Sequence, residues 1–360
     1  MTNQRFPIPP LPWNIWPTAD RHGLEQARRP GDVVDEGGPA SHWSERTATQ
    51  MRVNYGCWLG WLAARGHLVP DEKPQARATP ERIDAYIAEL TAVMAPRSVE
   101  RRITFLVQAL RVMVPGLDLA GLRRRAATLN AAAVPVRDKR ARLVPVPVLI
   151  DAGIGLMAAA ERGTFSDLER AAHFRDGLMI AFLALRPVRL GNLAGMRLGQ
   201  QVLIDRGAVS VAFSAGEVKN RQPLEFPWPA PLLERLQVYL ERYRPRLLDG
   251  QSHAALWVSH RGAAFTPKQC QYWLGKRTQS TLGQPVGPHL FRDCAATTIA
   301  LLAPKEARII SSILGHEDPQ VAARHYNHAG ALVAAQAHQA RILALRAGGN
   351  SDRAASMEKV

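Results

Sequence analysis

Six side chains suited to phosphoryl transfer lie in the second half of the sequence. They are Arg189, Lys219, His289, Arg292, His316 and Tyr326. A tyrosine hydroxyl can attack a phosphodiester and form a covalent intermediate that conserves the energy of the broken bond. Guanidinium groups hold phosphate oxygens where negative charge grows, lysine can protonate a leaving oxygen, and histidine exchanges protons near neutral pH. The set therefore suits cutting and rejoining of a phosphodiester without a metal ion.

Taken singly, each of these residues also has an ordinary structural explanation. Arg189 could pair with an acid, Lys219 could be a solvated lysine of a hairpin, and Tyr326 could be a core residue of an amphipathic helix. The histidines could cap or end helices. Only the order and context of the six residues make the set specific.

The surrounding pattern predicts the elements that position these residues. Helices are expected over roughly 147–162 and 166–186, with Arg189 at a helix boundary. Alternation over 208–226 with a turn at 214–216 predicts an antiparallel hairpin, with Lys219 just after its turn. His289 and Arg292 are three residues apart, so they share one face of a helix. This half of the chain should be mostly helical, with one small sheet.

The first half reads as a helical bundle that follows an extended arm. Residues 1–40 are rich in Pro and Gly without a sustained period, so we expect an arm or tail. Apolar residues at spacings of three and four then predict a helix that ends near Gly66. Thr79-Pro80-Glu81 is a typical start for a second helix, and a third should begin near Ser98.

The charge of the chain points to a polyanionic partner. The sequence has 360 residues with 46 Lys and Arg against 31 Asp and Glu, a net charge of +15, and a pI near 10.5. Residues 97–142 contain eleven basic and three acidic residues, a net charge of +8. A charge run is also compatible with a solvated surface, but nucleic acid is the favoured partner. The candidate DNA-binding residues are Arg97, Arg101, Arg102, Arg137, Lys139, Arg140 and Arg142.

The three cysteines, Cys57, Cys270 and Cys294, lack the spacing of a metal site, so we expect no metal and no cofactor. No signal peptide is evident at the start, and the longest apolar runs fall far short of a membrane span of about 20 residues. We therefore expect a cytoplasmic protein with no membrane partner.

The six residues and their motifs together resemble the tyrosine recombinases, the phage-integrase family, from roughly Val144 to Ala329. The family's first arginine motif is resembled by R-L-G-N-L-A-G-M-R-L from Arg189, and its hairpin lysine by Lys219. Its H-x-L-R-H-x-x-A-T motif is resembled by H-L-F-R-D-C-A-A-T from His289. L-G-H ends at His316, and R-H-Y-N-H contains Tyr326.

The resemblance implies a role for each of these residues. Tyr326 is the nucleophile, Arg189 and Arg292 hold the non-bridging oxygens, and Lys219 is the general acid. His289 takes part in proton transfer at the tyrosine, and His316 hydrogen-bonds the phosphate.

Three departures from the family pattern stand out. Asn192 occupies a position where the family usually has an acid, and Asp293 follows the second arginine where a histidine is common. The interval from His316 to Tyr326 is one residue longer than usual. The first departure puts any carboxylate role at position 192 in doubt.

The resemblance implies a mainly α fold with a small antiparallel sheet: an N-terminal helical core-binding (SAM-like) bundle and a C-terminal catalytic domain. The expected boundaries are an arm over 1–40, a core DNA-binding domain over 41–134, a basic linker over 135–147, a catalytic domain over 148–346 and a tail over 347–360. The implied activity is site-specific recombination or integration of double-stranded DNA, independent of metal and ATP, with a homo-tetramer as the assembly on DNA.

Two alternatives remain open at this point. A type IB topoisomerase would use the same chemistry only to relax DNA. A DNA-binding protein with a decayed active site would use none of it.

Overall fold

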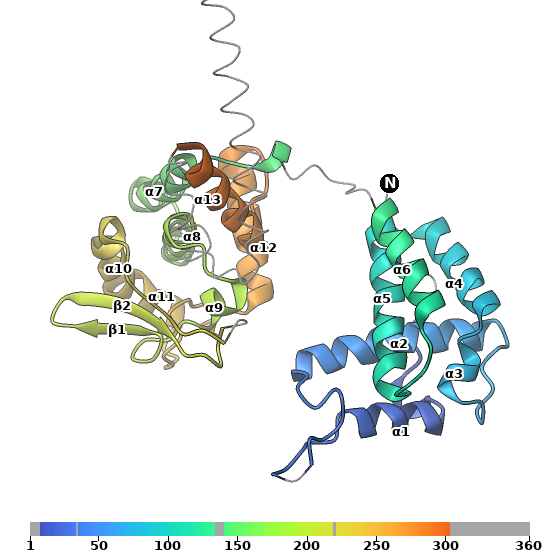
Figure 1. Cartoon of the computed structure of the whole chain (residues 1–360). Helices are drawn as coiled ribbons and strands as arrows, with labels where there is room; N and C mark the ends of the chain where they lie inside the picture. Colours follow the sequence, from blue (N-terminus) through green and yellow to red (C-terminus); the bar gives the residue numbers. More distant parts are fainter. Residues whose placement is uncertain (1–7, 34, 134–139, 219–220, 303–360) are drawn as a thin grey trace, which may run out of the picture. The chain divides into compact units, whose positions relative to one another are not determined.

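Two separate hydrophobic cores divide the chain into two units, Met1–Asp138 and Lys139–Val360 (Figure 1). The computed structural model describes residues 8–33, 35–133, 140–218 and 221–302. The division falls inside the basic stretch that the sequence predicts as a linker. Each unit is described by itself below.

The regular elements of the first unit, in its described residues, are all helices. Its elements are η1 (Trp13–Ile15), α1 (Thr18–Ala27), α2 (Glu45–Ala64), α3 (Pro74–Arg77), α4 (Pro80–Val93), α5 (Pro96–Met113) and α6 (Ala120–Ala132). Local signals set the helix ends: Thr79 caps α4 by accepting from the backbone N–H of Arg82, and Gly66 has a left-handed φ of +71° just after α2. The core contains the fully buried Tyr55, Trp58 and Tyr86.

The prediction of an extended arm over residues 1–40 is wrong for the part that the structure describes. Residues Thr18–Ala27 form α1, and Leu24 and Ala27 are buried in the core of the first unit. Trp16 packs on Tyr55, with their ring centroids 5.2 Å apart. The segment is part of the folded unit because Trp16, Leu24 and Ala27 are buried in its core.

Close backbone contact explains how the N-terminal segment reaches the bundle. The N–H of Leu11 donates to the carbonyl of Gly56 on α2 at 2.8 Å. A Cβ atom at Gly60, one turn further along α2, would lie 2.4 Å from the carbonyl oxygen of Pro9. Glycine at this position is therefore required for the segment to lie along α2. A glycine in the middle of a helix was the sequence signal for this contact.

The second unit is mostly helical, with one three-stranded sheet. Its elements are η2 (Arg140–Arg142), α7 (Val146–Arg162), α8 (Asp167–Leu185), α9 (Leu190–Gly195), β1 (Val202–Asp205), β2 (Ala208–Phe213), β3 (Leu224–Pro227), η3 (Ala230–Leu232), α10 (Leu233–Val238), the π-helix η4 (Tyr239–Tyr243), α11 (Arg244–Leu248), α12 (Pro267–Leu282) and α13 (Pro288–Leu302). The fold class predicted from the sequence is confirmed.

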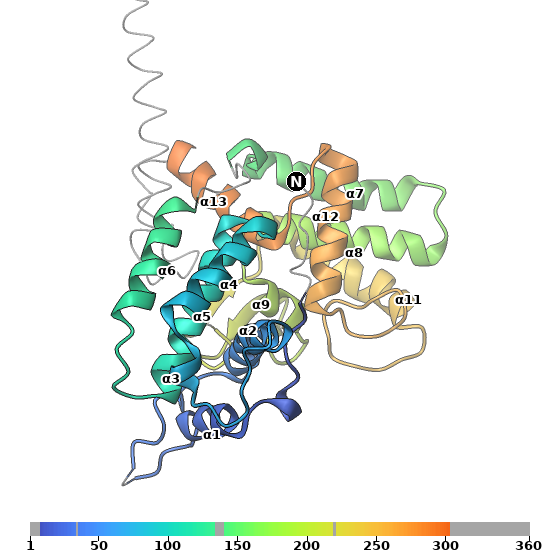
Figure 2. The same ribbon diagram turned by 90° about the vertical axis from the view of Figure 1, so that its right-hand side faces the viewer.

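Helices α7 and α8 form the centre of this unit and lie side by side in both views (Figures 1 and 2). Their close approach depends on small residues, since a Cβ at Gly153 would lie 2.7 Å from the carbonyl oxygen of Gly177. Ser166 and Glu169 form a capping box at the start of α8. The helices predicted over 147–162 and 166–186 correspond to α7 and α8 and are confirmed.

The sheet is antiparallel in the order β1-β2-β3. Val211 of β2 pairs with Val202 of β1 on one side and with Phe226 of β3 on the other. The predicted hairpin is β2–β3, and the turn between its strands begins where Ser214 accepts from the N–H of Glu217 at 3.1 Å. The sequence analysis missed β1, because this four-residue strand buries only Val202 and so lacks an alternating pattern.

Candidate active site

Arg189 is placed by the abrupt end of α8. Phe182 and its neighbours on α8 are fully buried, and Pro187 then prevents the helix from continuing. Arg189 has an extended backbone (φ −67°, ψ 150°) and forms the N-cap of the short helix α9. Its side chain is half-buried. The predicted helix boundary at Arg189 is therefore confirmed.

His289 and Arg292 both lie in the first half of α13, as their spacing predicts. Pro288 begins the helix, and Phe291 and Ala296 anchor it in the core. His289 is exposed, whereas the side chain of Arg292 is only 9% exposed. The helix thus presents one ring toward solvent and holds one guanidinium in a buried position.

The fold brings Arg292 to the segment that carries Arg189. Nη1 of Arg292 donates to the carbonyl oxygen of Pro187 at 2.6 Å, across 105 residues of sequence. Burial and, to a lesser extent, the positive charge of Arg189 lower the pKa of Arg292 to about 10, although Asp293 acts in the opposite direction. Arg292 remains charged at neutral pH, so two like charges are held close together. Such a pair is suited to hold an anion with oxygens on two sides, such as a phosphate group.

Asn192, three residues after Arg189, connects this segment to the turn between β2 and β3. Its Nδ2 atom donates to the carbonyl oxygen of Glu217 at 3.1 Å. Glu217 lies two residues before Lys219, which is outside the described residues. His316 and Tyr326 lie outside them as well, so half of the predicted catalytic set is located by sequence alone.

The predicted DNA-binding arginines of the first unit differ in their surroundings. Arg101 on α5 is exposed, with its guanidinium 5.5 Å from the ring centroid of Phe105. Arg97 donates to Asn130 and lies 3.8 Å from Glu100.

Arg102, next to Arg101 in sequence, is half-buried and its Nη1 atom is enclosed. Burial raises the pKa of Tyr86 above its usual range, and the charge of Arg102 opposes that rise. The side chain of Arg102 therefore packs into the bundle, whereas that of Arg101 faces solvent.

The linker candidates are only partly described. Arg137, Lys139 and the side chain of Arg140 lie outside the described residues. Arg142 donates to the carbonyl oxygen of Pro285 at 3.0 Å, just before α13. The N–H of Val144 donates to Sγ of Cys294 on α13 at 3.3 Å. The end of the basic stretch is thus attached to the helix that carries His289.

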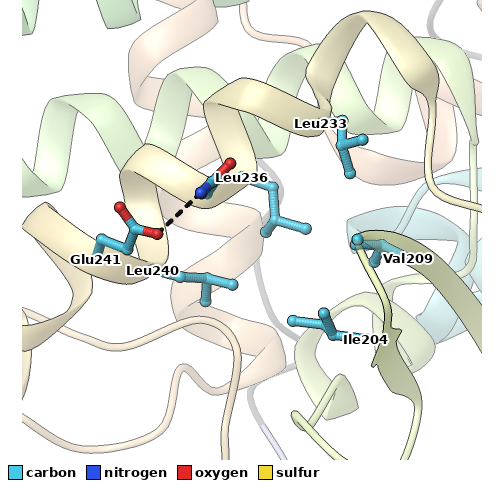
Figure 3. Close-up of a pocket in the computed structure, with 8 residues that line it drawn as sticks. Ile204, Val209, Leu233, Leu236, Leu240 and Glu241 are labelled. Atoms are coloured by element: carbon cyan, nitrogen blue, oxygen red, sulfur yellow. Dashed lines mark hydrogen bonds between the residues drawn. The ribbon is translucent and has the colours of Figure 1, made fainter.

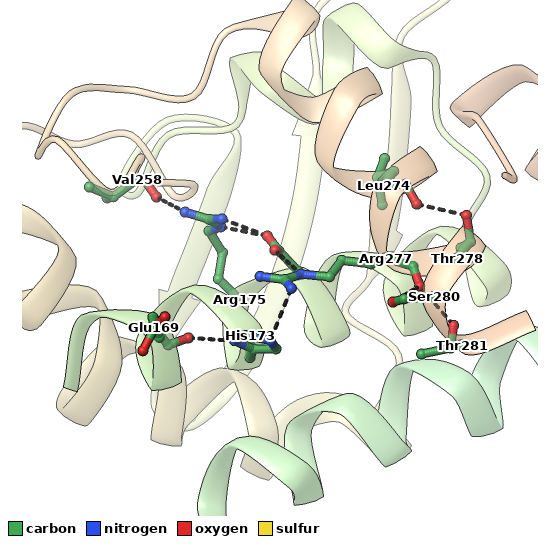
Figure 4. A network of polar contacts seen from close by, with 10 residues as sticks. Glu169, His173, Arg175, Val258, Leu274, Arg277, Thr278, Ser280 and Thr281 are labelled. Atoms are coloured by element: carbon green, nitrogen blue, oxygen red, sulfur yellow. Dashed lines mark hydrogen bonds and ion pairs between the residues drawn. The ribbon is translucent and has the colours of Figure 1, made fainter. Parts of the chain in front are cut away.

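A buried charged network that the sequence analysis missed fastens α12 to α8 (Figure 4). Arg175 and Asp176 are both 1% exposed and form an ion pair of 2.6 Å. Nε of Arg277 on α12 donates to the other oxygen of Asp176 at 2.8 Å, and its Nη1 contacts His173 at 2.9 Å. The signal in the sequence was an Arg-Asp pair inside an otherwise apolar helix. The network is structural, because each charge has a partner within the protein.

A cavity of about 270 Å³ lies between the β1–β2 hairpin and α10–η4 (Figure 3). Ile204, Val209, Leu236 and Leu240 line it, so its surface is mostly aliphatic. None of Arg189, His289 and Arg292, the predicted catalytic residues that the structure describes, lines it, and its aliphatic surface does not suit a phosphate.

The described residues form neither a metal cluster nor a membrane-spanning helix. They contain no group of three or more His, Cys, Asp or Glu placed to bind a metal ion. Among them there is also no helix long and apolar enough to cross a membrane.

The chain is similar to curated proteins of one family. The chain is 26% identical to tyrosine recombinase XerD of Chlorobaculum tepidum over 298 residues, which is 80% of this chain and 87% of the relative. It is 27% identical to tyrosine recombinase XerC of Mycobacterium leprae over 176 residues, 49% of this chain and 56% of the relative. Both relatives are tyrosine recombinases, and they support the family that the sequence motifs resemble.

Structural comparison agrees at the level of the fold. The XerH site-specific recombinase, in a post-cleavage complex with its difH substrate, matches with a TM-score of 0.51 and 10% sequence identity. The match covers 76% of this chain and 73% of that one. No family model matches the chain. The resemblance on which the sequence analysis relied is confirmed by the curated relatives.

Proposed function

We propose that this recombinase cuts and rejoins duplex DNA at a specific site, one strand at a time, through Tyr326. The observation that carries the proposal is the contact of Arg292 with Pro187, which brings Arg292 close enough to Arg189 for their charges to interact. These two arginines come from motifs far apart in sequence, and they are the two that the family motif assigns to the phosphate. Their arrangement suits a phosphodiester whose negative charge grows in the transition state.

The chemical step balances without a cofactor. The Oη atom of Tyr326 attacks phosphorus, the bond from phosphorus to the 5′ oxygen breaks, and a 3′-phosphotyrosyl bond replaces it. His289 accepts the tyrosine proton, and Lys219 donates a proton to the leaving 5′ oxygen. The 5′-hydroxyl of a second strand then attacks the phosphotyrosyl bond and releases the tyrosine.

Three positively charged or polar groups would hold the phosphate during this step. Arg189 and Arg292 bind the non-bridging oxygens, and His316 donates a hydrogen bond to the phosphate. A two-arginine site is effective because its charges are fixed before the reaction begins. The energy of the phosphodiester is conserved in the intermediate, so ATP is not needed.

The first unit would provide most of the affinity for the DNA backbone. The exposed arginines of α5 and α6 include Arg101, Arg111 and Arg123, and phosphate contacts of this kind release counterions. We propose residues 41–134 as the core of this DNA-binding domain and 148–346 as the catalytic domain, joined by the linker over 135–147. A homo-tetramer on DNA, a role on a mobile element and a cytoplasmic location are parts of the same proposal.

A nicked suicide substrate tests the proposal. The target site is first mapped by footprinting, and a duplex with a nick beside the scissile phosphate is then incubated with the protein. Wild type should trap a covalent 3′ adduct that is visible on a denaturing gel, and Tyr326→Phe should trap none. Tyr272→Phe is the control, because Tyr272 is a 59% exposed tyrosine of α12 outside the motif, and it should behave as wild type.

Two outcomes would contradict the proposal in different ways. If neither wild type nor Tyr326→Phe traps an adduct on the mapped site, the enzymatic proposal fails. If Tyr326→Phe still traps one, the nucleophile has been assigned to the wrong residue.

A further inference from the structure

Asn192 joins the helix that begins at Arg189 to the turn that precedes Lys219. The residue lies in the first turn of α9, three positions after Arg189. Its Nδ2 atom donates to the main-chain carbonyl of Glu217 at 3.1 Å, across 25 residues of sequence. This hydrogen bond connects two segments that each carry a predicted catalytic residue.

The partner atom explains why this chain has an amide at position 192. A carbonyl oxygen can only accept a hydrogen bond, so the amide NH₂ group must face it. An ionised Asp or Glu has no proton to donate and would place a second negative oxygen against the carbonyl. Near the N-terminus of a helix a carboxylate would otherwise be favoured by the helix dipole. The need for a donor therefore outweighs that local preference.

The turn that Asn192 holds is itself well ordered. The carboxylate of Glu217 accepts from the N–H of Ser214 at 2.8 Å and from its hydroxyl at 2.7 Å. Nε2 of Gln201 donates to the other oxygen at 2.6 Å. The bonds from Ser214, and then that from Gln201, lower the pKa of Glu217, so it is ionised at neutral pH.

The end of the turn is anchored by packing. The side chain of Val218 is only 6% exposed and belongs to the core of the second unit. Its carbonyl accepts from the N–H of Arg221 at 2.9 Å. Asn192 is thus hydrogen-bonded to a segment that its other hydrogen bonds and its core contact keep rigid, so the segment moves as one piece.

We propose that Asn192 is a positioning residue that sets the segment carrying Lys219 relative to Arg189 at the reacting phosphate. The inference rests on the proposed function, in which Lys219 protonates the leaving oxygen. Asn192 acts through the carbonyl of Glu217 and does not touch the DNA. Its loss should therefore impair protonation of the leaving group more than binding of the DNA.

Single-turnover cleavage of the suicide substrate gives the first test. Asn192→Asp removes the donor at almost constant volume and should slow cleavage by about 10- to 100-fold, as small displacements of catalytic groups do. Asn192→Ala removes the bond without adding repulsion and should slow it less. The Kd for DNA and the thermal unfolding midpoint should stay close to those of wild type.

A matched control breaks a bond of similar chemistry elsewhere in the same unit. Gln237 donates to Glu241 at 3.0 Å on the exposed surface of α10–η4. Gln237→Ala should leave the cleavage rate unchanged. If Asn192→Asp cleaves at the wild-type rate, the inference is wrong. The proposed function is not affected by that result as long as the wild-type protein forms the covalent adduct.

A substrate with sulfur in place of the bridging 5′ oxygen gives the decisive readout. A thiolate leaves without protonation, so this substrate should restore the rate of Lys219→Ala, which should be slowed by about 10²- to 10⁴-fold on the ordinary substrate. It should also restore the rate of Asn192→Asp. If the sulfur rescues Lys219→Ala but not Asn192→Asp, the positioning role is wrong. If it rescues neither, the assignment of Lys219 in the proposed function is wrong.

Discussion

Arg77 in the first unit and Arg292 in the second are both buried, yet their surroundings are opposite. Arg77 is fully buried and forms an ion pair with the equally buried Asp20, which also accepts from Oη of Tyr55 at 2.6 Å. Arg292 is held by a carbonyl oxygen and lies near a second arginine.

The difference shows how the same residue type serves two purposes. A buried arginine that is neutralised within the protein fixes structure, since neither ion can leave without exposing the other. Two arginines that lie close together create a positive electrostatic potential, which attracts an anion from outside the protein. In the first unit the buried Arg77 holds α1 in place, whereas Arg292 of the second unit is one of the two arginines that we propose for the phosphate.

The substitution with the largest expected effect removes Arg77 and lowers the stability of the first unit. Arg77→Ala leaves the carboxylate of Asp20 buried without its partner, which should lower the free energy of unfolding by about 3–5 kcal/mol. Urea unfolding followed by tryptophan fluorescence measures the change. Arg65→Ala is the control, because it breaks an exposed ion pair with Glu89, and it should change stability far less. Equal losses of stability in the two variants would contradict the claim that the buried ion pair of Arg77 holds the first unit together.

The pH dependence of stability shows whether burial or ion pairing dominates at Asp20. Burial raises the pKa of Asp20, and the bonds from Tyr55 and Arg77 oppose the rise. The folded protein therefore binds this proton at a higher pH than the unfolded chain does. Its free energy of unfolding, relative to that of Asp20→Asn, should grow as the pH falls through the raised pKa toward 3.8. The opposite slope would mean that attraction to Arg77 outweighs burial.

The second effect is on catalysis rather than stability. Arg292→Ala should slow adduct formation by about 10²- to 10³-fold, as loss of one preorganised donor to a developing charge does elsewhere. Arg292→Lys keeps a charge but not the planar fork, so it should restore only part of the rate. Arg235→Ala, which removes a half-exposed partner of Glu161, is the control. If Arg292→Ala unfolds the protein and Arg292→Lys cleaves normally, Arg292 is structural like Arg77.

The smallest effect separates two neighbouring arginines of α5. Arg101 is exposed, so Arg101→Ala should weaken DNA binding a few-fold and reduce the slope of log K against log salt by about 1. Arg102 is set against Tyr86, so Arg102→Ala should lower stability and leave the salt slope unchanged. Filter binding at several salt concentrations and urea unfolding measure the two quantities. The reverse pattern would place Arg102, and not Arg101, on the DNA-binding face.

Most helices could be predicted because their signals are local. Thr79-Pro80 marks the start of α4, and Gly66 follows the end of α2. The helix α1 could not be predicted in this way, since it is short and has few apolar residues. Its place in the core depends on backbone contacts with Gly56 and Gly60 of a different helix.

The sequence by itself predicted the fold class, the resemblance to the tyrosine recombinases and the six candidate catalytic residues, because motif order and helical period are properties of neighbouring residues. Only the tertiary structure decided which of these residues meet. The contact of Arg292 with Pro187 and the bond from Asn192 to Glu217 join distant segments through packing of α8, α9, α13 and the sheet. Such contacts have no local signal, because the partner of Asn192 is a main-chain carbonyl, which every residue possesses.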